Sequence, residues 1–190
     1  MSTSLQPGQQ VILDGTALTP LRVGLGWDST DTEEVLLART RTIDLDLGCL
    51  LLDRSGSVVD TATSAHLRSK DGSVTHSGDN MTGAGAGDDE VITVDLTTLH
   101  PAVTHLAFTV VSITGQNFAH IDNAYCRVTT ETDQEIARFD LTETGGTHTA
   151  QFTASLTRAG SDFALKSHGV HTDARTHDEL IPTVVSQLLD

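Results

Sequence analysis

The chain has 190 residues, a length typical of one domain of about 100–200 residues. It carries 11 Lys and Arg against 26 Asp and Glu, which gives a formal net charge of −15. Binding to a nucleic-acid backbone or to an anionic membrane surface requires a basic protein surface, and so few cations cannot form one. We therefore expect no nucleic-acid partner. The acidic balance favours cations as ligands, although a solvated acidic surface would account for part of the charge.

Apolar and alternating segments separated by turn residues recur at short intervals, which is typical of an all-β sandwich. A turn at Asp14-Gly15 separates the first two segments, and residues 103–113 are apolar on both faces, which predicts a central strand. Residues 121–129 and 134–141 are expected to pair as a hairpin. The predicted strands are residues 11–13, 21–26, 43–53, 58–59, 91–96, 103–113, 121–129, 134–141, 148–156 and 161–168.

The C-terminal part of the chain predicts a strand with one buried face, a linker and a helix. Residues 169–176 are expected to be the linker and residues 177–189 the helix, with Pro182 in its first turn. We therefore expect two antiparallel-rich sheets with short peripheral helices, organised as a β-sandwich domain over 1–170 and a C-terminal tail or short helix over 171–190. Alternation within the strand 148–156 predicts one shared face for Ala150, Phe152, Ala154 and Leu156.

The two cysteines, Cys49 and Cys126, are too few for a disulfide framework and lie in predicted strands, so we expect buried free thiols. No charged segment followed by an apolar run begins the chain, and no apolar run approaches the roughly 20 residues that span a bilayer. We therefore expect a cytoplasmic protein without a transmembrane segment.

One segment, residues 78–90, combines four glycines, four acids and an asparagine with no Lys or Arg. Glycines allow sharp turns that aim carbonyls inward, and the carboxylates add hard oxygen ligands. Calcium takes about 6–8 such ligands at roughly 2.3–2.6 Å, whereas magnesium demands stricter geometry and is the second choice. The EF-hand, phosphate-loop and dinucleotide-binding patterns are absent, because Met81, Ala84 and Asp88 stand where those motifs need an oxygen ligand, a lysine and a glycine. A solvated surface loop is the alternative.

Other acids strengthen the case for a metal site. Asp44 and Asp46 begin a strand face that continues as apolar, and carboxylates there are costly unless they are paired or bound to a metal. Asp28 is a further isolated acid at a strand end. Adjacent like charges about 4 Å apart repel by about 4 kcal/mol at an effective dielectric near 20, and seven converging acids would favour two Ca²⁺ ions over one. The seven are Asp28, Asp44, Asp46, Asp79, Asp88, Asp89 and Glu90.

Several short motifs follow one another along the chain. Leu25-Gly26-Trp27-Asp28 and Asp44-Leu45-Asp46 come first, and residues 76–83 then lead into Gly87-Asp88-Asp89-Glu90. Further motifs are Gln116-Asn117-Phe118, Asn123-Ala124-Tyr125, residues 135–139, Arg158 and Phe163. Together they cover roughly residues 5–170 and resemble the tellurium-resistance TerD family.

The resemblance implies a β-sandwich domain that binds calcium and is not an enzyme, and the charge count above favours two Ca²⁺ ions. It also implies a bacterial, cytoplasmic protein of tellurite resistance and chemical stress response that acts as a metal-dependent interaction module. Its partners would be calcium and other proteins of the resistance system, through which it could associate peripherally with a membrane. The ligands implied are Asp28, Asp44, Asp46, Asp79, Asn80, Asp88, Asp89 and Glu90, with the carbonyls of Gly83 and Gly87.

Three other readings stay open from the residues alone. The same acids could hold Mg²⁺ or Ca²⁺ around a phosphate in a metal-dependent phosphoester hydrolase, for which His76 is the obvious general base. His168, His171 and His177 could bind Zn²⁺, although solvated histidines fit this spacing better. The chain could also be an acidic structural domain with no ligand.

Overall fold

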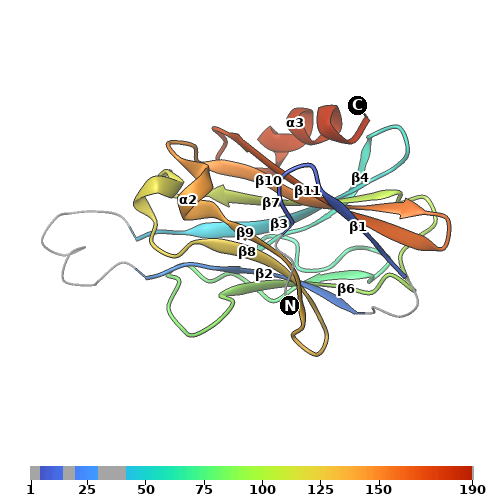
Figure 1. Ribbon diagram of the computed structural model, residues 1–190, viewed down its shortest axis with the longest axis horizontal. Coiled ribbons are helices and arrows are strands. Elements are labelled where there is room, and N and C mark those ends of the chain that lie inside the picture. Colours follow the sequence, from blue (N-terminus) through green and yellow to red (C-terminus); the bar gives the residue numbers. More distant parts are fainter. Residues whose placement is uncertain (1–4, 15–19, 30–41, 190) are drawn as a thin grey trace, which may run out of the picture.

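The computed structural model describes residues 5–14, 20–29 and 42–189, so part of the predicted turn at Asp14-Gly15 lies outside the described residues. Two antiparallel sheets stack face to face, and one helix lies on the outside of one sheet (Figure 1). This confirms the predicted all-β sandwich with short peripheral helices. Within the described ranges, no helix is long and apolar enough to cross a membrane.

The first sheet has six strands in the order β1-β11-β10-β7-β3-β4. The apolar segment that was expected to be central is β7, which lies between β10 and β3. β3 is buried along its whole length, because the sandwich core covers one face and helix α3 covers the other. The strands are β1 (Gln10–Leu13), β3 (Leu45–Leu52), β4 (Val58–Ala62), β7 (His105–Ser112), β10 (Ala150–Ala159) and β11 (Asp162–Thr172).

The second sheet has five strands in the order β5-β6-β2-β8-β9, and β8 and β9 form the expected hairpin. β8 begins at Tyr125 rather than at residue 121, because a short 3₁₀ helix, η1 (Phe118–His120), and a turn with Asn123 at φ 53° precede it. The strands are β2 (Leu21–Gly26), β5 (Val74–His76), β6 (Glu90–Val94), β8 (Tyr125–Thr130) and β9 (Glu135–Asp140).

The core between the sheets is built from alternate residues of each strand. On β2 these are Leu21, Val23 and Leu25, which are fully buried. Cys49 and Cys126 lie in the same core as free thiols, as expected. Burial raises the pKa of Cys126 to about 12, so this thiol stays protonated at neutral pH.

A β-bulge in β10 contradicts the predicted shared face of the strand. The register against both neighbouring strands shifts between Phe152 and Ala154. Ala150 and Phe152 therefore face α3, whereas Ala154 and Leu156 face the core between the sheets. One extra residue in a strand reverses the faces of the side chains that follow it.

Helix α3 (His177–Leu189) covers the outer face of the six-stranded sheet (Figure 1), where Leu180 and Val184 pack against Leu50 and Phe152. Pro182 lies in the second turn of the helix and not in the first. β11 continues to Thr172, so the first half of the expected linker is strand. A short helix, α2 (Leu141–Gly145), follows β9 and is capped by Asp140, whose Oδ1 accepts a 2.8 Å hydrogen bond from the Glu143 N–H.

Candidate metal centre

The acidic glycine loop connects β5 to β6. Gly78, Gly83, Gly85 and Gly87 all have positive φ angles, of 109°, 63°, 146° and 94°, which other residues rarely adopt. Gly83 is also buried, and a Cβ there would lie 2.4 Å from Nε1 of Trp27. The loop therefore needs glycine for its backbone conformation and, at residue 83, also for close packing.

Asn80 organises this loop. Its Oδ1 accepts hydrogen bonds from the N–H groups of Thr82 and Gly83, both at 3.1 Å. Its Nδ2 donates to Oδ1 of Asp89 at 3.0 Å, and its own N–H donates to Oε1 of Glu90 at 3.0 Å. Asn80 therefore ties the start of the loop to Asp89 and Glu90 at its end, where the next strand begins.

Glu90 reaches from the first residue of β6 to the opposite sheet. β4 pairs with β3 only from Cys49 onward, so among the described residues no strand pairs with Leu47 on that side. The Leu47 N–H instead donates to Oε2 of Glu90 at 2.8 Å. The fully buried carboxylate thus replaces a strand at this edge and ties the two sheets together.

His76 completes the same edge. The Gly78 N–H donates to Nδ1 at 3.0 Å, so Nε2 carries the proton and donates to the Leu47 carbonyl at 3.1 Å. Nε2 is also 3.5 Å from Oε2 of Glu90. Both ring nitrogens are therefore engaged in hydrogen bonds, which leaves no free lone pair to act as a general base.

Asp44 lies just before β3, half-buried, with Oδ1 buried and without a hydrogen-bond partner among the described residues. Burial, and after it the charges of Asp79, Glu90 and Asp46, together raise its pKa to about 6. Asp79 is exposed and, within the described residues, accepts no hydrogen bond. A cation between Asp44 and Asp79 would relieve this repulsion.

Asp46 faces outward from β3, beneath α3. Its Oδ2 accepts a 2.9 Å hydrogen bond from Oγ of Ser64 and lies 3.4 Å from Nε2 of His177. Burial alone would raise the pKa of Asp46, but His177 and Ser64 stabilise the charged form and lower it below its ordinary value. Candidate ligand atoms of Asp46, His76 and Glu90 lie within 4.8 Å of one another, but both nitrogens of His76 are already hydrogen-bonded, so of these three it is the two carboxylates that could contact a cation.

Asp28 and Asp89 form a second acidic group. Oδ2 of Asp89 accepts from the Trp27 N–H at 3.0 Å, while Oδ2 of exposed Asp28 accepts from Nδ2 of Asn123 at 2.6 Å. Burial raises the pKa of Asp89 against the lowering effect of the Trp27 hydrogen bond, and the charges of Asp88 and Asp28 add to the rise. This group therefore also carries excess negative charge.

Asp88 differs from the other acids of the loop, because it lies over Gly24 on the outer face of the second sheet. Nε of Arg127 lies 2.7 Å from its Oδ1 and Nη2 lies 3.0 Å from its Oδ2, which is a bidentate ion pair. The Tyr125 hydroxyl donates to Oδ1 at 3.1 Å. The charge of Asp88 is thus already matched within the protein.

The structure brings the predicted ligands together in two groups and leaves one acid ion-paired. Asn80 bridges the two groups through its contacts with Glu90 and Asp89. Gly83 is buried against Trp27, and Gly87 is exposed. The first group contains Asp44, Asp46, Asp79 and Glu90, and the second contains Asp28 and Asp89.

Two features escaped sequence reasoning. Arg127 and Asn123 were not expected to hold Asp88 and Asp28, although Arg127 alternates with buried Cys126 and so had to face outward.

The three histidines considered as zinc ligands do not lie together. His168 contacts Ser155, His171 contacts Gln151, and His177 contacts Thr109.

Comparison with known proteins places this arrangement in a family. The family model described as "TerD domain" matches residues 1–176. The chain belongs to the TerD family. Its TerD domain is similar to that of tellurium resistance protein TerZ of Serratia marcescens, with 42% identity over 191 residues that cover 98% of each chain. It is also similar to general stress protein 16U of Bacillus subtilis (strain 168), with 34% identity over 179 residues, 89% of this chain and 90% of that protein.

A solved structure shares the TerD fold. It is a homologue of telluride resistance protein (TerD), SCO6318 from Streptomyces coelicolor A3(2), which aligns with a TM-score of 0.73 and 20% identity over 87% of this chain and 96% of its own. The resemblance drawn from the sequence motifs is therefore confirmed. These relatives are named as resistance or stress proteins and not as enzymes.

Proposed function

We propose that this TerD-family protein is a non-enzymatic, calcium-binding module of the cytoplasmic response to tellurite and chemical stress. The observation that carries the proposal is the carboxyl of Asp44. It keeps a buried, unpartnered oxygen, and its pKa of about 6 reflects burial and the nearby charges of Asp79, Glu90 and Asp46. A bound cation would stabilise a group in this condition, and the loop that faces it supplies no Lys or Arg to do so.

The donor set supports Ca²⁺ and two sites. It consists of carboxylates, an amide and loop carbonyls, which are the hard oxygen donors that Ca²⁺ takes in irregular arrangements. Each acidic group contains one carboxyl with a raised pKa, Asp44 in the first and Asp89 in the second. One ion in each group would offset the repulsion in both. The proposed ligands remain Asp28, Asp44, Asp46, Asp79, Asn80, Asp88, Asp89, Glu90 and the carbonyls of Gly83 and Gly87, with the smallest part for ion-paired Asp88.

Such binding would order the loop and so control an interaction surface. The loop is anchored by Asn80 and Glu90 at its ends, while residues 84–87 between them are exposed. A bound cation would remove the repulsion that opposes the closed loop, so the exposed part would be presented in one conformation. Other proteins of the resistance system are the proposed readers of that surface, and any attachment to a membrane would go through them.

The hydrolase alternative is less well supported, because it needs a general base. His76 is the histidine of this cluster, and its Nδ1 lone pair already accepts the Gly78 N–H. Taking a proton from water would require breaking that hydrogen bond in a buried site.

Isothermal titration of metal-free protein with CaCl₂ and with MgCl₂ tests the proposal. We expect two Ca²⁺ per chain and weaker Mg²⁺ binding. Asp44→Asn and Asp89→Asn should each weaken one site. Asp162→Asn is the matched control, because Asp162 is the first residue of β11, next to the β10–β11 turn and at the far end of the sheet from Asp44. An absence of Ca²⁺ binding by the wild-type chain would refute the proposal.

A further inference from the structure

A pocket of about 310 Å³ opens beside the second acidic group. Its lining includes Asp28, the loop glycines Gly85 and Gly87, Tyr125 and Arg138. This volume is at the lower end of the range of roughly 300–1,000 Å³ for small-molecule sites. The pocket therefore places a proposed ion ligand and a guanidinium on the walls of one cavity.

The guanidinium of Arg138 is held in place on its wall. It lies over the ring of Tyr125, 3.9 Å from the ring centroid, and its Nη1 is 3.2 Å from Oε2 of Glu135. The Tyr125 ring is itself fixed, because its hydroxyl donates to Asp88. Arg138 is thus a preorganised donor group with a planar fork that suits oxyanions.

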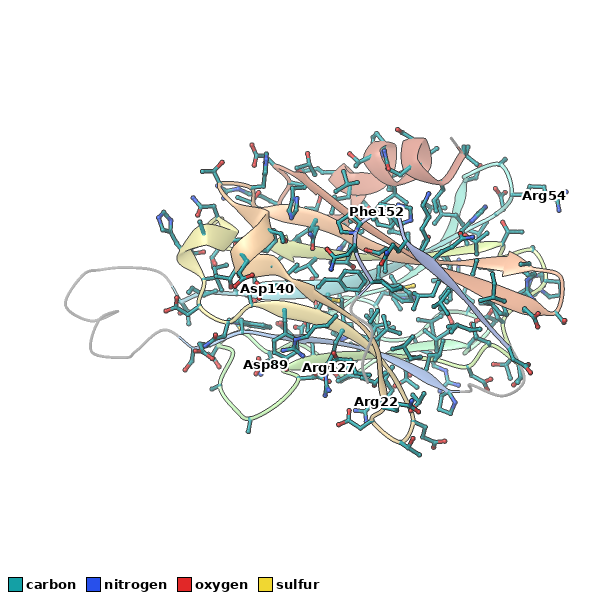
Figure 2. All side chains as sticks on the ribbon, in the orientation of Figure 1. Arg22, Arg54, Asp89, Arg127, Asp140 and Phe152 are labelled. Carbon is teal, nitrogen blue, oxygen red and sulfur yellow. The ribbon has the colours of Figure 1, made fainter. Side chains whose placement is uncertain are left out.

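The acids on the pocket walls are also fixed. Asn123, held at φ 53°, donates to Asp28 and keeps that carboxylate at the pocket rim. Asp140 lines the same pocket but is engaged as the N-cap of α2. Figure 2 shows Asp89 and Asp140 on the half of the molecule opposite to Arg54.

We propose that this pocket binds a small oxyanion, either free or as the phosphate of a small metabolite, between the Asp28–Asp89 cation site and Arg138. The inference rests on the proposed function, because without a cation Asp28 and Asp89 would repel an anion. Asp28 is exposed toward the pocket, so a Ca²⁺ held there would have ligand positions that the protein does not fill. An anionic oxygen would fill such a position while Arg138 binds the remaining oxygens.

An organic cation fits the same walls less well. Recognition of such a cation uses the open face of an aromatic ring, and Arg138 already covers Tyr125. Trp27 also lines the pocket but is 4% exposed, so it offers almost no ring face. The accessible chemistry of the pocket is therefore a guanidinium together with a cation site.

The test has two titrations on the full chain. The first measures Ca²⁺ binding alone. The second adds glycerol 3-phosphate, sulfate or tellurite to Ca²⁺-saturated protein and to protein in EDTA. We expect at least one oxyanion to bind only when Ca²⁺ is present. Comparing glycerol 3-phosphate, which is a phosphomonoester, with the inorganic ions distinguishes a phosphorylated metabolite from a free oxyanion.

Two variants separate the pocket from the rest of the surface. Arg138→Gln should bind Ca²⁺ like the wild type, which also shows that it folds, and should weaken oxyanion binding at least about tenfold. Arg54→Gln is the control, because Arg54 is exposed in the β3–β4 turn at the other end of the molecule (Figure 2). If Ca²⁺ binds but no oxyanion does, or if Arg138→Gln or EDTA leaves oxyanion binding unchanged, the inference fails alone. If Ca²⁺ itself does not bind, the proposed function fails with it.

Discussion

Replacing Asp44 by asparagine should stabilise the metal-free protein and at the same time remove part of its response to Ca²⁺. Asparagine has nearly the same shape as aspartate but carries no charge. In the absence of metal it should therefore relieve the repulsion from Asp79, Glu90 and Asp46. In the presence of metal it should offer a weaker ligand.

The size of the effect follows from the pKa of Asp44, which burial and then the neighbouring acids raise from 3.8 to about 6. At 1.36 kcal/mol per pH unit this is about 3 kcal/mol, and solvent screening of a half-buried group reduces it to about 1–2 kcal/mol. Because the folded-state pKa is the higher one, the carboxylate costs stability above about pH 6, and the metal-free wild type regains that stability as the pH falls toward 3.8. Asp44→Asn should have this additional stability already at neutral pH.

Thermal unfolding in EDTA and in CaCl₂ measures both parts. In EDTA at about pH 7.5, Asp44→Asn should melt about 2–8 °C above the wild type, given about 2–4 °C per kcal/mol for a chain of this length. At 100 times Kd, each Ca²⁺ site should stabilise the wild type by about 2.7 kcal/mol, and the variant should lose the gain from one site. Asp162→Asn should match the wild type in both buffers. The reasoning is refuted if Asp44→Asn melts at or below the wild type in EDTA, or if it keeps the full Ca²⁺ gain.

Three further predictions address other parts of the structure. Burial lowers the pKa of His168 to about 4, so its contribution to stability is present above pH 6.5 and is lost as the pH falls toward 4. In urea unfolding at several pH values, His168→Gln should remove about 1–3 kcal/mol of the loss of unfolding free energy on acidification. An unchanged pH dependence of the unfolding free energy would contradict this. Asp88→Asn should change the Ca²⁺ affinity less than about threefold in calorimetry, because Asp88 is already ion-paired. Asp89→Asn should weaken the affinity about tenfold or more. The reverse order of the two effects would show that the ion pair opens. Gly48→Ala would place a methyl group 2.5 Å from the ring of His177, so it should cost about 1–3 kcal/mol and speed proteolysis of α3, and an unaltered digestion rate would argue against that contact.

Much of the fold could be predicted from hydrophobic patterning, because most strands keep one register over many residues. β7 is apolar on both faces and is central, and the β8–β9 hairpin pairs as expected. β5 was missed because three residues are too few to show alternation. The bulge at Phe152 and Ala154 was also missed, since one inserted residue leaves the apolar pattern intact while reversing the faces that it describes.

The acidic loop could be recognised from its composition, but the fate of each acid could not. Asp88 and Asp89 are adjacent and therefore point to opposite sides of an extended chain. One of them meets Arg127 outside the sheet, and the other meets Trp27 and Asn80 inside the loop. Alternation alone could have separated these two acids, whereas the partner of each depends on strand order, which sequence spacing does not encode.

Hydrogen bonds divide the acids according to what each is able to do. Glu90 uses one oxygen for the Leu47 N–H and the other for the Asn80 N–H, so its first role is to close the loop onto β3. Asp44 has a buried oxygen with no such donor, and Asp79 accepts none within the described residues. Buried carboxylates are stable only when they are paired, hydrogen-bonded or bound to a cation. The loop itself supplies no Lys or Arg, and within the described residues the donors that shape it leave the buried oxygen of Asp44 without a partner, so the same hydrogen-bonding pattern that fixes the loop also favours the proposed cation.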